Sequence, residues 1–265
     1  MAPETLLACC DQGRLWDADA RGAGPPDLAT AYRDALAVRA LRIARGEVPA
    51  GYKIGFTNRT IWQRYGVFAP IWGTVWNTNL THCEGAGAVS LAGTTQPRLE
   101  PEIVFGLAAP PPADATLEQV FACVDWLAPG FEVVQSHAPG WKFSAAETVA
   151  DGGLHARLLV GRRTPVRALA GSGVALDDRL AASGVRLLHE GHLIEAGQGR
   201  NVLDGPLHAL RHFVRELQAC PGAPALRAGD VVTTGTWTDA WPLLPGQRWH
   251  AVFDAPLGEL SIDLA

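Results

Sequence analysis

The sequence lacks the features that mark several large classes of protein. Its 265 residues carry 22 Lys and Arg against 27 Asp and Glu, so it has no excess of positive charge to bind a nucleic-acid backbone. No stretch approaches the roughly 18 apolar residues that cross a bilayer, and the N-terminus lacks the basic and apolar regions of a secretory signal. We therefore expect a protein that binds neither nucleic acid nor a membrane.

Cysteine is scarce and scattered. The five cysteines are odd in number and contain no C-x-x-C spacing, which argues against a disulfide framework and against a structural zinc site. Free thiols fit a reducing compartment, so the sequence predicts a cytoplasmic location.

Several catalytic signatures are also missing. None of the eight histidines lies in an H-E-x-x-H motif, and no serine lies in G-x-S-x-G. No glycine-rich stretch has the order of a phosphate-binding loop or a dinucleotide fingerprint. We assign no histidine to a metal site, and any chemistry must come from other groups.

The apolar pattern predicts helices mixed with strands. Helices are expected over 26–48, 58–65, 116–127 and 205–220, and strands over 51–56, 96–105, 131–135 and within 229–264. We interpret the Pro-Gly pair at 129 and 130 as the end of the third helix. Strands outnumber βα alternations, so we expect one α+β domain over 1–265 with a rolled mixed sheet. Its part at about 1–50 would be helical, and 51–265 would be β-rich and catalytic.

The segment QPRLEPEIVF places Glu100 and Glu102 two residues apart in an apolar strand. Side chains alternate between faces, so the two carboxylates and Arg98 point the same way. Glu132 lies in the next apolar strand, and if the strands are neighbours three carboxylates converge. Such an all-oxygen set suits Mg²⁺ or Mn²⁺. The alternative is a solvated strand face partly neutralised by Arg98.

Lysine and tryptophan provide two further candidates. Lys53 lies in GYKIGF between glycines that permit close backbone approach, where it would bind a substrate carboxylate or act as an acid and base. A lysine on the solvent side of an edge strand is the alternative. Trp72 and Trp76 are two of nine tryptophans, and they would line an apolar substrate pocket or simply fill the core.

Seven motifs taken together resemble a known family. They are GYKIGFTN, PIWGTVW, QPRLEPEIVF, FEVVQS, WKF followed by TVADGG, GQGRNVLDGPLHAL and LRAGDVVTTGT. In this order they resemble the 2-oxopent-4-enoate hydratase and 2-oxo-3-hexenedioate decarboxylase family of the fumarylacetoacetate hydrolase superfamily, from about Tyr32 to the C-terminus. The resemblance implies a mixed β-roll with flanking helices, and a homo-oligomer. It also implies Mg²⁺ or Mn²⁺ bound by Glu100, Glu102 and Glu132, with Lys53 and Thr236 contacting the substrate.

The chain departs from the family pattern at three places. Asn77 stands where hydratases carry an aspartate, and an amide cannot take a proton as a base. The family's Asp-Asn-Ala-Ser becomes Asp151, Gly152, Gly153 and Leu154, and its Ser-Arg becomes Ser136 and His137. The catalytic positions implied by the resemblance are therefore Lys53, Asp151 and Asn77, two of them in altered surroundings.

The resulting hypothesis is a metal-dependent hydratase of a 2-hydroxydienoate or 2-oxo-enoate in the catabolism of aromatic compounds. A 2-oxo acid offers a carboxylate and an adjacent carbonyl oxygen to a cation, which stabilises enolate charge. The same device would serve a 2-oxo-enedioate decarboxylase, an acylpyruvate-type hydrolase or a non-catalytic protein that binds 2-oxo acids. Hydrolases of that type carry a His and Glu pair near the N-terminus, whereas the first histidine here is His82.

Overall fold

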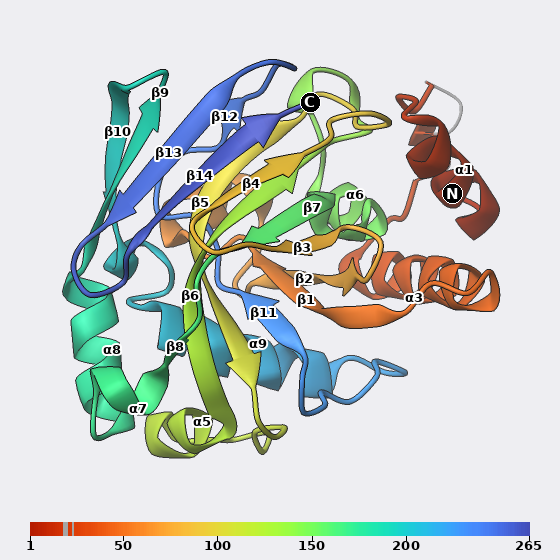
Figure 1. Ribbon diagram of the computed structural model, residues 1–265. Helices are drawn as coiled ribbons and strands as arrows, with labels where there is room; N and C mark the ends of the chain where they lie inside the picture. The colour runs from red at the N-terminus through yellow and green to blue at the C-terminus, as the bar shows by residue number, and fades with distance from the viewer. Residues whose placement is uncertain (18–20, 23) are drawn as a thin grey trace.

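The computed structural model describes residues 1–17, 21–22 and 24–265 (Figure 1). Its strands are β1 (Pro49–Gly55), β2 (Ile71–Trp76), β3 (Leu80–His82), β4 (Ala86–Val89), β5 (Arg98–Leu107), β6 (Val124–Val134), β7 (His155–Val160), β8 (Thr164–Pro165), β9 (Gly184–His189), β10 (His192–Gln198), β11 (Val231–Thr233), β12 (Trp241–Pro242), β13 (Arg248–Phe253) and β14 (Glu259–Leu264). Its α-helices are α1 (Pro3–Gln12), α3 (Leu28–Ala44), α4 (Trp62–Tyr65), α5 (Leu117–Cys123), α6 (Ala145–Ala150), α7 (Val166–Leu169), α8 (Gly173–Ala182) and α9 (Pro206–Ala219). Short 3₁₀ turns are η1 (Arg59–Ile61), η2 (Pro139–Trp141), η3 (Gly152–Leu154) and η4 (Gly199–Asn201).

The strands form two mixed sheets. The larger has the order β2-β1-β11-β5-β6-β7-β3, with β12 paired to β5 and β8 to β6. The smaller has the order β10-β9-β13-β14-β4. β1 is parallel to β11 and β3 to β7, while β5 and β6 are antiparallel neighbours over most of their length. The long β5 and β6 strands therefore lie at the centre of the larger sheet.

Helices cover the sheets in separate groups. Helix α9 buries one apolar stripe and packs against β1 and β2, behind the larger sheet in Figure 1. Helices α5 and α8 pack with α9, whereas α1, α3 and α6 form a second group beside β2. The largest apolar cluster lies between the helices and both sheets, and its largest fully buried side chain is Trp237.

Most of the elements predicted from the sequence are present. The helix expected at 205–220 is α9, and Asn58 accepts a hydrogen bond from the Thr60 N–H where the short helical segment begins. That segment ends at Gly66, which adopts the left-handed conformation with φ 62°. Thr116 and Gln119 form the predicted capping box of α5.

One prediction about strand β6 is wrong. Pro129 and Gly130 do not end a helix but lie inside β6. Helix α5 ends at Cys123, and the chain then continues as a strand that pairs with β5 over most of its length. Pro129 lies between the part of β6 that pairs with β8 and the part that pairs with β7. Proline is tolerated there because neither of these strands pairs with β6 at this residue, so its missing N–H removes no hydrogen bond to them. A side chain on Gly130 would come within 2.5 Å of Val104.

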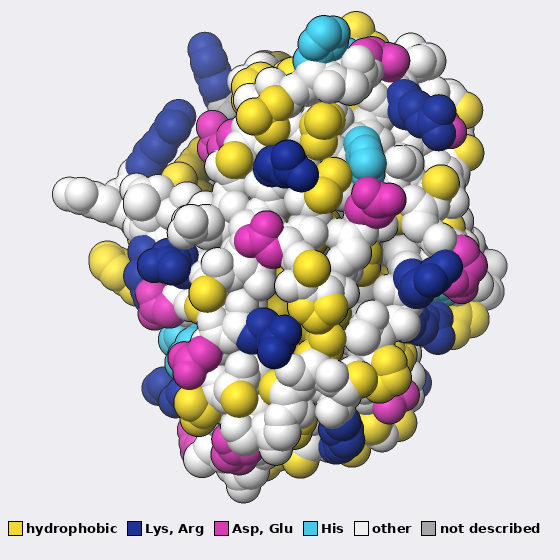
Figure 2. Space-filling model, turned by 60° about the vertical axis from the view of Figure 1, so that its left-hand side comes forward, with side chains coloured by type: hydrophobic (Ala, Val, Ile, Leu, Met, Phe, Trp, Pro, Cys, Tyr) yellow, Lys and Arg dark blue, Asp and Glu magenta, His cyan; other side chains and the backbone are white. Residues whose placement is uncertain are grey.

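The surface carries mixed charge. On the face in Figure 2, acidic and basic side chains are interspersed with apolar ones, and neither sign forms an extended patch. Among the described residues, the structure has no helix of the length and apolar character that crossing a membrane requires.

Candidate active site

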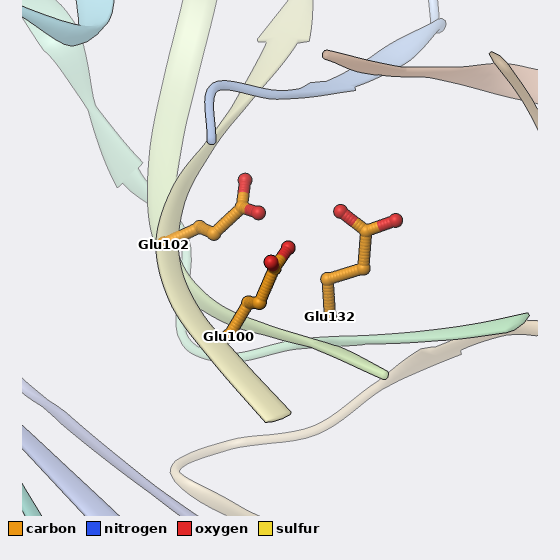
Figure 3. Close-up of side chains that lie close together, drawn as sticks. All are labelled: Glu100, Glu102 and Glu132. Atoms are coloured by element: carbon orange, nitrogen blue, oxygen red, sulfur yellow. The ribbon is translucent and has the colours of Figure 1, made fainter. Parts of the chain in front are cut away.

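Three glutamates converge on the central strands. Glu100 lies directly opposite Glu132 in the pairing of β5 with β6, and Glu102 follows Glu100 on the same face of β5. One carboxylate oxygen of each residue lies within 4.8 Å of the others, and Figure 3 shows the three carboxylates facing a common space. The structure thus brings together the residues that the sequence proposes as metal ligands.

The contacts of Glu102 fit a divalent cation. Its Oε2 accepts hydrogen bonds from the N–H groups of Thr234 at 2.9 Å and Gly235 at 2.7 Å. Its Oε1 is buried and has no hydrogen-bond partner among the described residues. A buried carboxylate oxygen without a partner is costly in free energy unless a cation or a proton lies against it. The other candidate metal-ligand atoms nearby are carboxylate oxygens of Glu100 and Glu132. Such a set is suited to a hard divalent cation such as Mg²⁺ or Mn²⁺.

Glu132 is held by two side chains at one oxygen. The Nζ of Lys53 lies 3.3 Å from Glu132 Oε1, and the Nδ1 of His155 lies 2.7 Å from the same atom. All three side chains are buried, with at most 4% of any of them exposed. Lys53 is therefore not a surface lysine on an edge strand, because β1 lies between β2 and β11 and turns this side chain inward.

The cluster shifts the pKa values of its members in different directions. Burial and the neighbouring carboxylates raise the pKa of Glu102 well above its ordinary value, and burial raises the pKa of Glu100 to about 7. Burial also opposes the charge on Glu132, but Lys53 and His155 outweigh it and lower the pKa of that carboxyl. For Lys53 burial acts to lower the pKa, and attraction to the three carboxylates raises it overall. Lys53 and Glu132 therefore form a charged pair, and Glu100 and Glu102 carry charge only at a cost that a cation would relieve.

A cleft of about 390 Å³ opens beside this cluster. Lys53, Glu100 and the η3 turn line its inner part, together with the loop that follows β11. Its outer wall is aromatic: Phe56 stacks on Tyr65 at 4.9 Å between ring centroids, and Tyr65 stacks on Phe143 at 5.8 Å. The arrangement can hold a small planar molecule whose polar end reaches the carboxylates.

The cleft wall also contains cationic groups. The guanidinium of Arg98 lies 4.2 Å from the centre of the Trp141 ring, and both residues line the cleft. Arg64 lines the same wall. Arg98 precedes Glu100 by two residues on β5, so it lies on the same face at about 6.6 Å along the strand. The cleft that contains Glu100 is thus also lined by positively charged side chains.

The other residues proposed from the sequence are divided between two cavities. Thr236 lines the cleft beside the carboxylates. Trp72 and Trp76 do not, and the expectation that they line the same pocket needs correction. Trp72 pairs with Ile54, one residue beyond Lys53, so it points to the opposite face of β1 and β2. There Trp72 stacks on Tyr32 and, with Trp76, lines a separate cavity of about 60 Å³.

Asn77 and Asp151 also lie away from the cleft. Asn77 is exposed after the end of β2, and its side chain accepts a hydrogen bond from the Val48 N–H. Asp151 is the C-terminal cap residue of α6. Its carboxylate accepts a hydrogen bond from the backbone N–H of His137 at 2.9 Å and lies 2.5 Å from the Nδ1 of the same residue. Neither residue is among those that line the carboxylate cleft. Asp151 instead lines the smaller cavity beside Trp72 and Trp76.

Sequence reasoning did not identify His155 or the aromatic wall of the cleft as parts of the site. His155 has no motif around it, and its approach to Glu132 depends on the pairing of β6 with β7. Trp141 and Phe143 could have been found, because the WKF motif holds both, but their place at the cleft depends on the loop before α6.

Comparison with known proteins finds relatives along most of the chain. It is 33% identical over 235 residues to a 2-hydroxyhexa-2,4-dienoate hydratase of Comamonas testosteroni, covering 88% of this chain and 84% of that one. It is 30% identical over 242 residues to a 4-oxalocrotonate decarboxylase of a Pseudomonas species, covering 88% and 89%. No family model matches the chain.

The solved structures show the same fold. A 4-oxalocrotonate decarboxylase of Pseudomonas putida G7, complexed with magnesium and adipate, superposes with a TM-score of 0.88. The two are 24% identical, and the match covers 99% of this chain and 95% of that one. The predicted α+β fold of the fumarylacetoacetate-hydrolase type is confirmed by this likeness.

Proposed function

The chain belongs to the family of enzymes that contains 2-hydroxyhexa-2,4-dienoate hydratase and 4-oxalocrotonate decarboxylase, and on this basis we propose that it is a divalent-metal-dependent hydratase. Its substrate would be a 2-hydroxydienoate or 2-oxo-enoate from the catabolism of aromatic compounds. The observation that carries the proposal is the set of three converging carboxylates beside a buried lysine at the inner end of an aromatic cleft.

Glu100, Glu102 and Glu132 would hold the cation, which we propose to be Mg²⁺ or Mn²⁺. When bound, it would supply positive charge to the carboxylate and 2-oxo oxygens of the substrate and stabilise the enolate charge. The unpartnered Oε1 of Glu102 supports this assignment, as does the relative of known structure that was complexed with magnesium.

Lys53 would bind and protonate the substrate. Its ammonium group is buried, charged and adjacent to Glu132, so it can donate a hydrogen bond to a substrate oxygen or a proton to an enolate. The aromatic wall of Phe56, Tyr65 and Phe143 would pack against the unsaturated chain and limit the access of water to one side of it. Thr236 would contact the substrate from the loop after β11.

Two broader features of the protein are also proposals. Ile43 and Val48, at the end of α3 and just beyond it, are 43% and 56% exposed, which supports burial of this region in a homo-oligomer. The five cysteines are free, which supports a cytoplasmic location.

A substrate panel tests the proposed reaction. The purified protein is supplied with a 2-hydroxydienoate or a 2-oxo-enedioate, with Mg²⁺ or with a chelator. We expect Mg²⁺-dependent formation of a hydrated 2-oxo acid from the dienoate. The metal dependence is expected because the cation held by the carboxylates would bind the 2-oxo acid end of the substrate. Product identification and measurement of released CO₂ provide the readout. Absence of turnover with every 2-oxo acid would contradict the proposal.

A 2-oxo-enedioate decarboxylase is the second candidate, and Arg98 favours it. Its side chain lines the same cleft as Glu100, packed on Trp141, and could bind a distal carboxylate. Trp72 and Trp76, the residues that argued for an apolar tail, lie outside the cleft. The cleft therefore offers both an aromatic wall and a cation.

The substitution Arg98→Met separates the two candidates. If the distal group of the substrate is a carboxylate, we expect KM for the enedioate to rise by about tenfold or more while KM for the dienoate changes little, since a charged hydrogen bond contributes about 1.5–3 kcal/mol. Steady-state kinetics on both substrates measure the effect. Equal changes for the two substrates would show that Arg98 does not recognise the tail.

A further inference from the structure

His155 makes a buried hydrogen bond to one of the three glutamates. Its Nδ1 lies 2.7 Å from Glu132 Oε1, and the two side chains are 2% and 0% exposed. A carboxylate only accepts hydrogen bonds when ionised, so the imidazole carries its proton on Nδ1. Nε2 has no hydrogen-bond partner among the described residues, and the bond to Glu132 is the one polar contact of this ring there.

An irregularity in strand pairing aims His155 at Glu132. In the pairing of β6 with β7, Glu132 lies opposite Leu158 and Val133 opposite Arg157, but Val134 lies opposite His155 rather than Ala156. The extra residue is a β-bulge, which turns His155 to the face that also carries Glu132. Without it, His155 would point to the opposite face from Leu158, and so away from the carboxylate.

The bond to His155 restricts the carboxylate of Glu132. Lys53 and His155 both contact Oε1, and Oε2 has only a 3.4 Å contact with the Thr233 hydroxyl. Two donors at one oxygen, arriving from β1 and β7, fix the plane of the carboxylate and leave Oε2 the freer oxygen. Figure 3 shows this carboxylate turned toward those of Glu100 and Glu102.

We propose that His155 is a positioning residue that fixes the carboxylate of Glu132 for binding a divalent cation. The inference rests on the proposed function, since it takes the three glutamates as the ligands. Hydrogen-bond partners of metal ligands typically contribute 10–100-fold to metal affinity, because a free ligand must be ordered at each binding event. His155 is not among the residues that line the cleft beside the carboxylates.

Two substitutions distinguish positioning from packing. His155→Asn keeps a side-chain N–H at a distance from the backbone close to that of Nδ1, but it removes volume. His155→Phe keeps most of the volume and removes the donor. A positioning role predicts that Asn retains the Mn²⁺ dissociation constant of the parent protein within about threefold and that Phe raises it by about 10–100-fold. A packing role predicts the reverse order.

The measurement is a titration of the purified full chain with Mn²⁺ alone. Binding is monitored by calorimetry or by the electron paramagnetic resonance signal of the free ion. Thermal unfolding of each variant is recorded in parallel. His189→Phe is the matched control, because His189 is also a packed imidazole, stacked on Trp249 in the smaller sheet away from the glutamates. If His155→Phe does not fold, His155→Leu replaces it.

The outcomes separate this inference from the proposed function. Weak binding by the Phe variant together with near-normal binding by the Asn variant supports it. Equal binding by all variants, or loss with Asn and retention with Phe, overturns it while leaving the metal site in place. Failure of the unmodified protein to bind Mn²⁺ overturns the proposed metal dependence itself.

Discussion

The substitution Glu102→Gln is expected to abolish metal-dependent turnover while leaving the protein folded. The amide oxygen can still accept the N–H groups of Thr234 and Gly235, so the loop after β11 keeps its anchor. The charge at Oε1 is lost, and this atom is the buried oxygen that has no other partner. We expect a fall in kcat/KM of at least about 10²–10³-fold, the size seen when one electrostatic contact to a developing charge is removed.

A matched control makes this result specific to the cluster. Glu118 is also a carboxylate that accepts two backbone N–H groups, from Gly173 and Val174, but it lies at the start of α5. We expect Glu118→Gln to keep full turnover. Thermal unfolding and turnover at saturating Mg²⁺ are measured for both variants. Unchanged activity in Glu102→Gln would contradict the assignment of the metal ligands.

The glutamate cluster could be predicted because its logic is local. Alternation along one strand places Glu100 and Glu102 on one face, and this requires no knowledge of the fold. That Glu132 lies opposite Glu100 depends on the pairing register of β5 and β6, which spacing alone leaves open. The family motifs supplied what the spacing could not.

The remaining parts of the site depend on tertiary structure. Trp72 lies 19 residues from Lys53 and on a neighbouring strand, and a shift of one residue in register decides which face it occupies. The aromatic wall joins Phe56 and Tyr65 to Phe143, which lies 78 residues beyond Tyr65 in the chain. The contact of His155 with Glu132 depends on a β-bulge that the residue types around it do not predict. These contacts come from strand pairing and side-chain packing, and the same sequence pattern is compatible with several pairings and packings.

The two glycines of the η3 turn replace larger residues of the family motif, and in the structure the turn lies against β1 and β2. Both have positive φ, 65° at Gly152 and 72° at Gly153. A side chain on Gly152 would meet no atom within 4 Å, whereas one on Gly153 would come within 2.9 Å of the Lys53 side chain. The departure at Gly153 therefore affects the space around Lys53 directly.

The substitution Lys53→Met is expected to separate metal binding from turnover. Loss of the ammonium removes a proton donor, and we expect kcat to fall by about 10²–10⁴-fold, the range of general acid–base catalysis. The three carboxylates also lose the positive charge that lies 3.3 Å from Glu132, so they attract a divalent cation at least as strongly as before. Mn²⁺ titration and steady-state kinetics on the same preparation measure both effects.

Lys142 provides the control for Lys53, because it is the other lysine of the chain and is exposed. Lys142→Met should change neither the Mn²⁺ affinity nor kcat. A Lys53→Met variant that retained normal turnover would contradict its role in proton transfer. One that bound Mn²⁺ more weakly would show instead that Lys53 stabilises the cluster in its binding geometry. Retained affinity with lost turnover separates the group that moves protons from the groups that hold the cation, a division that Glu102→Gln cannot make because it removes both functions at once.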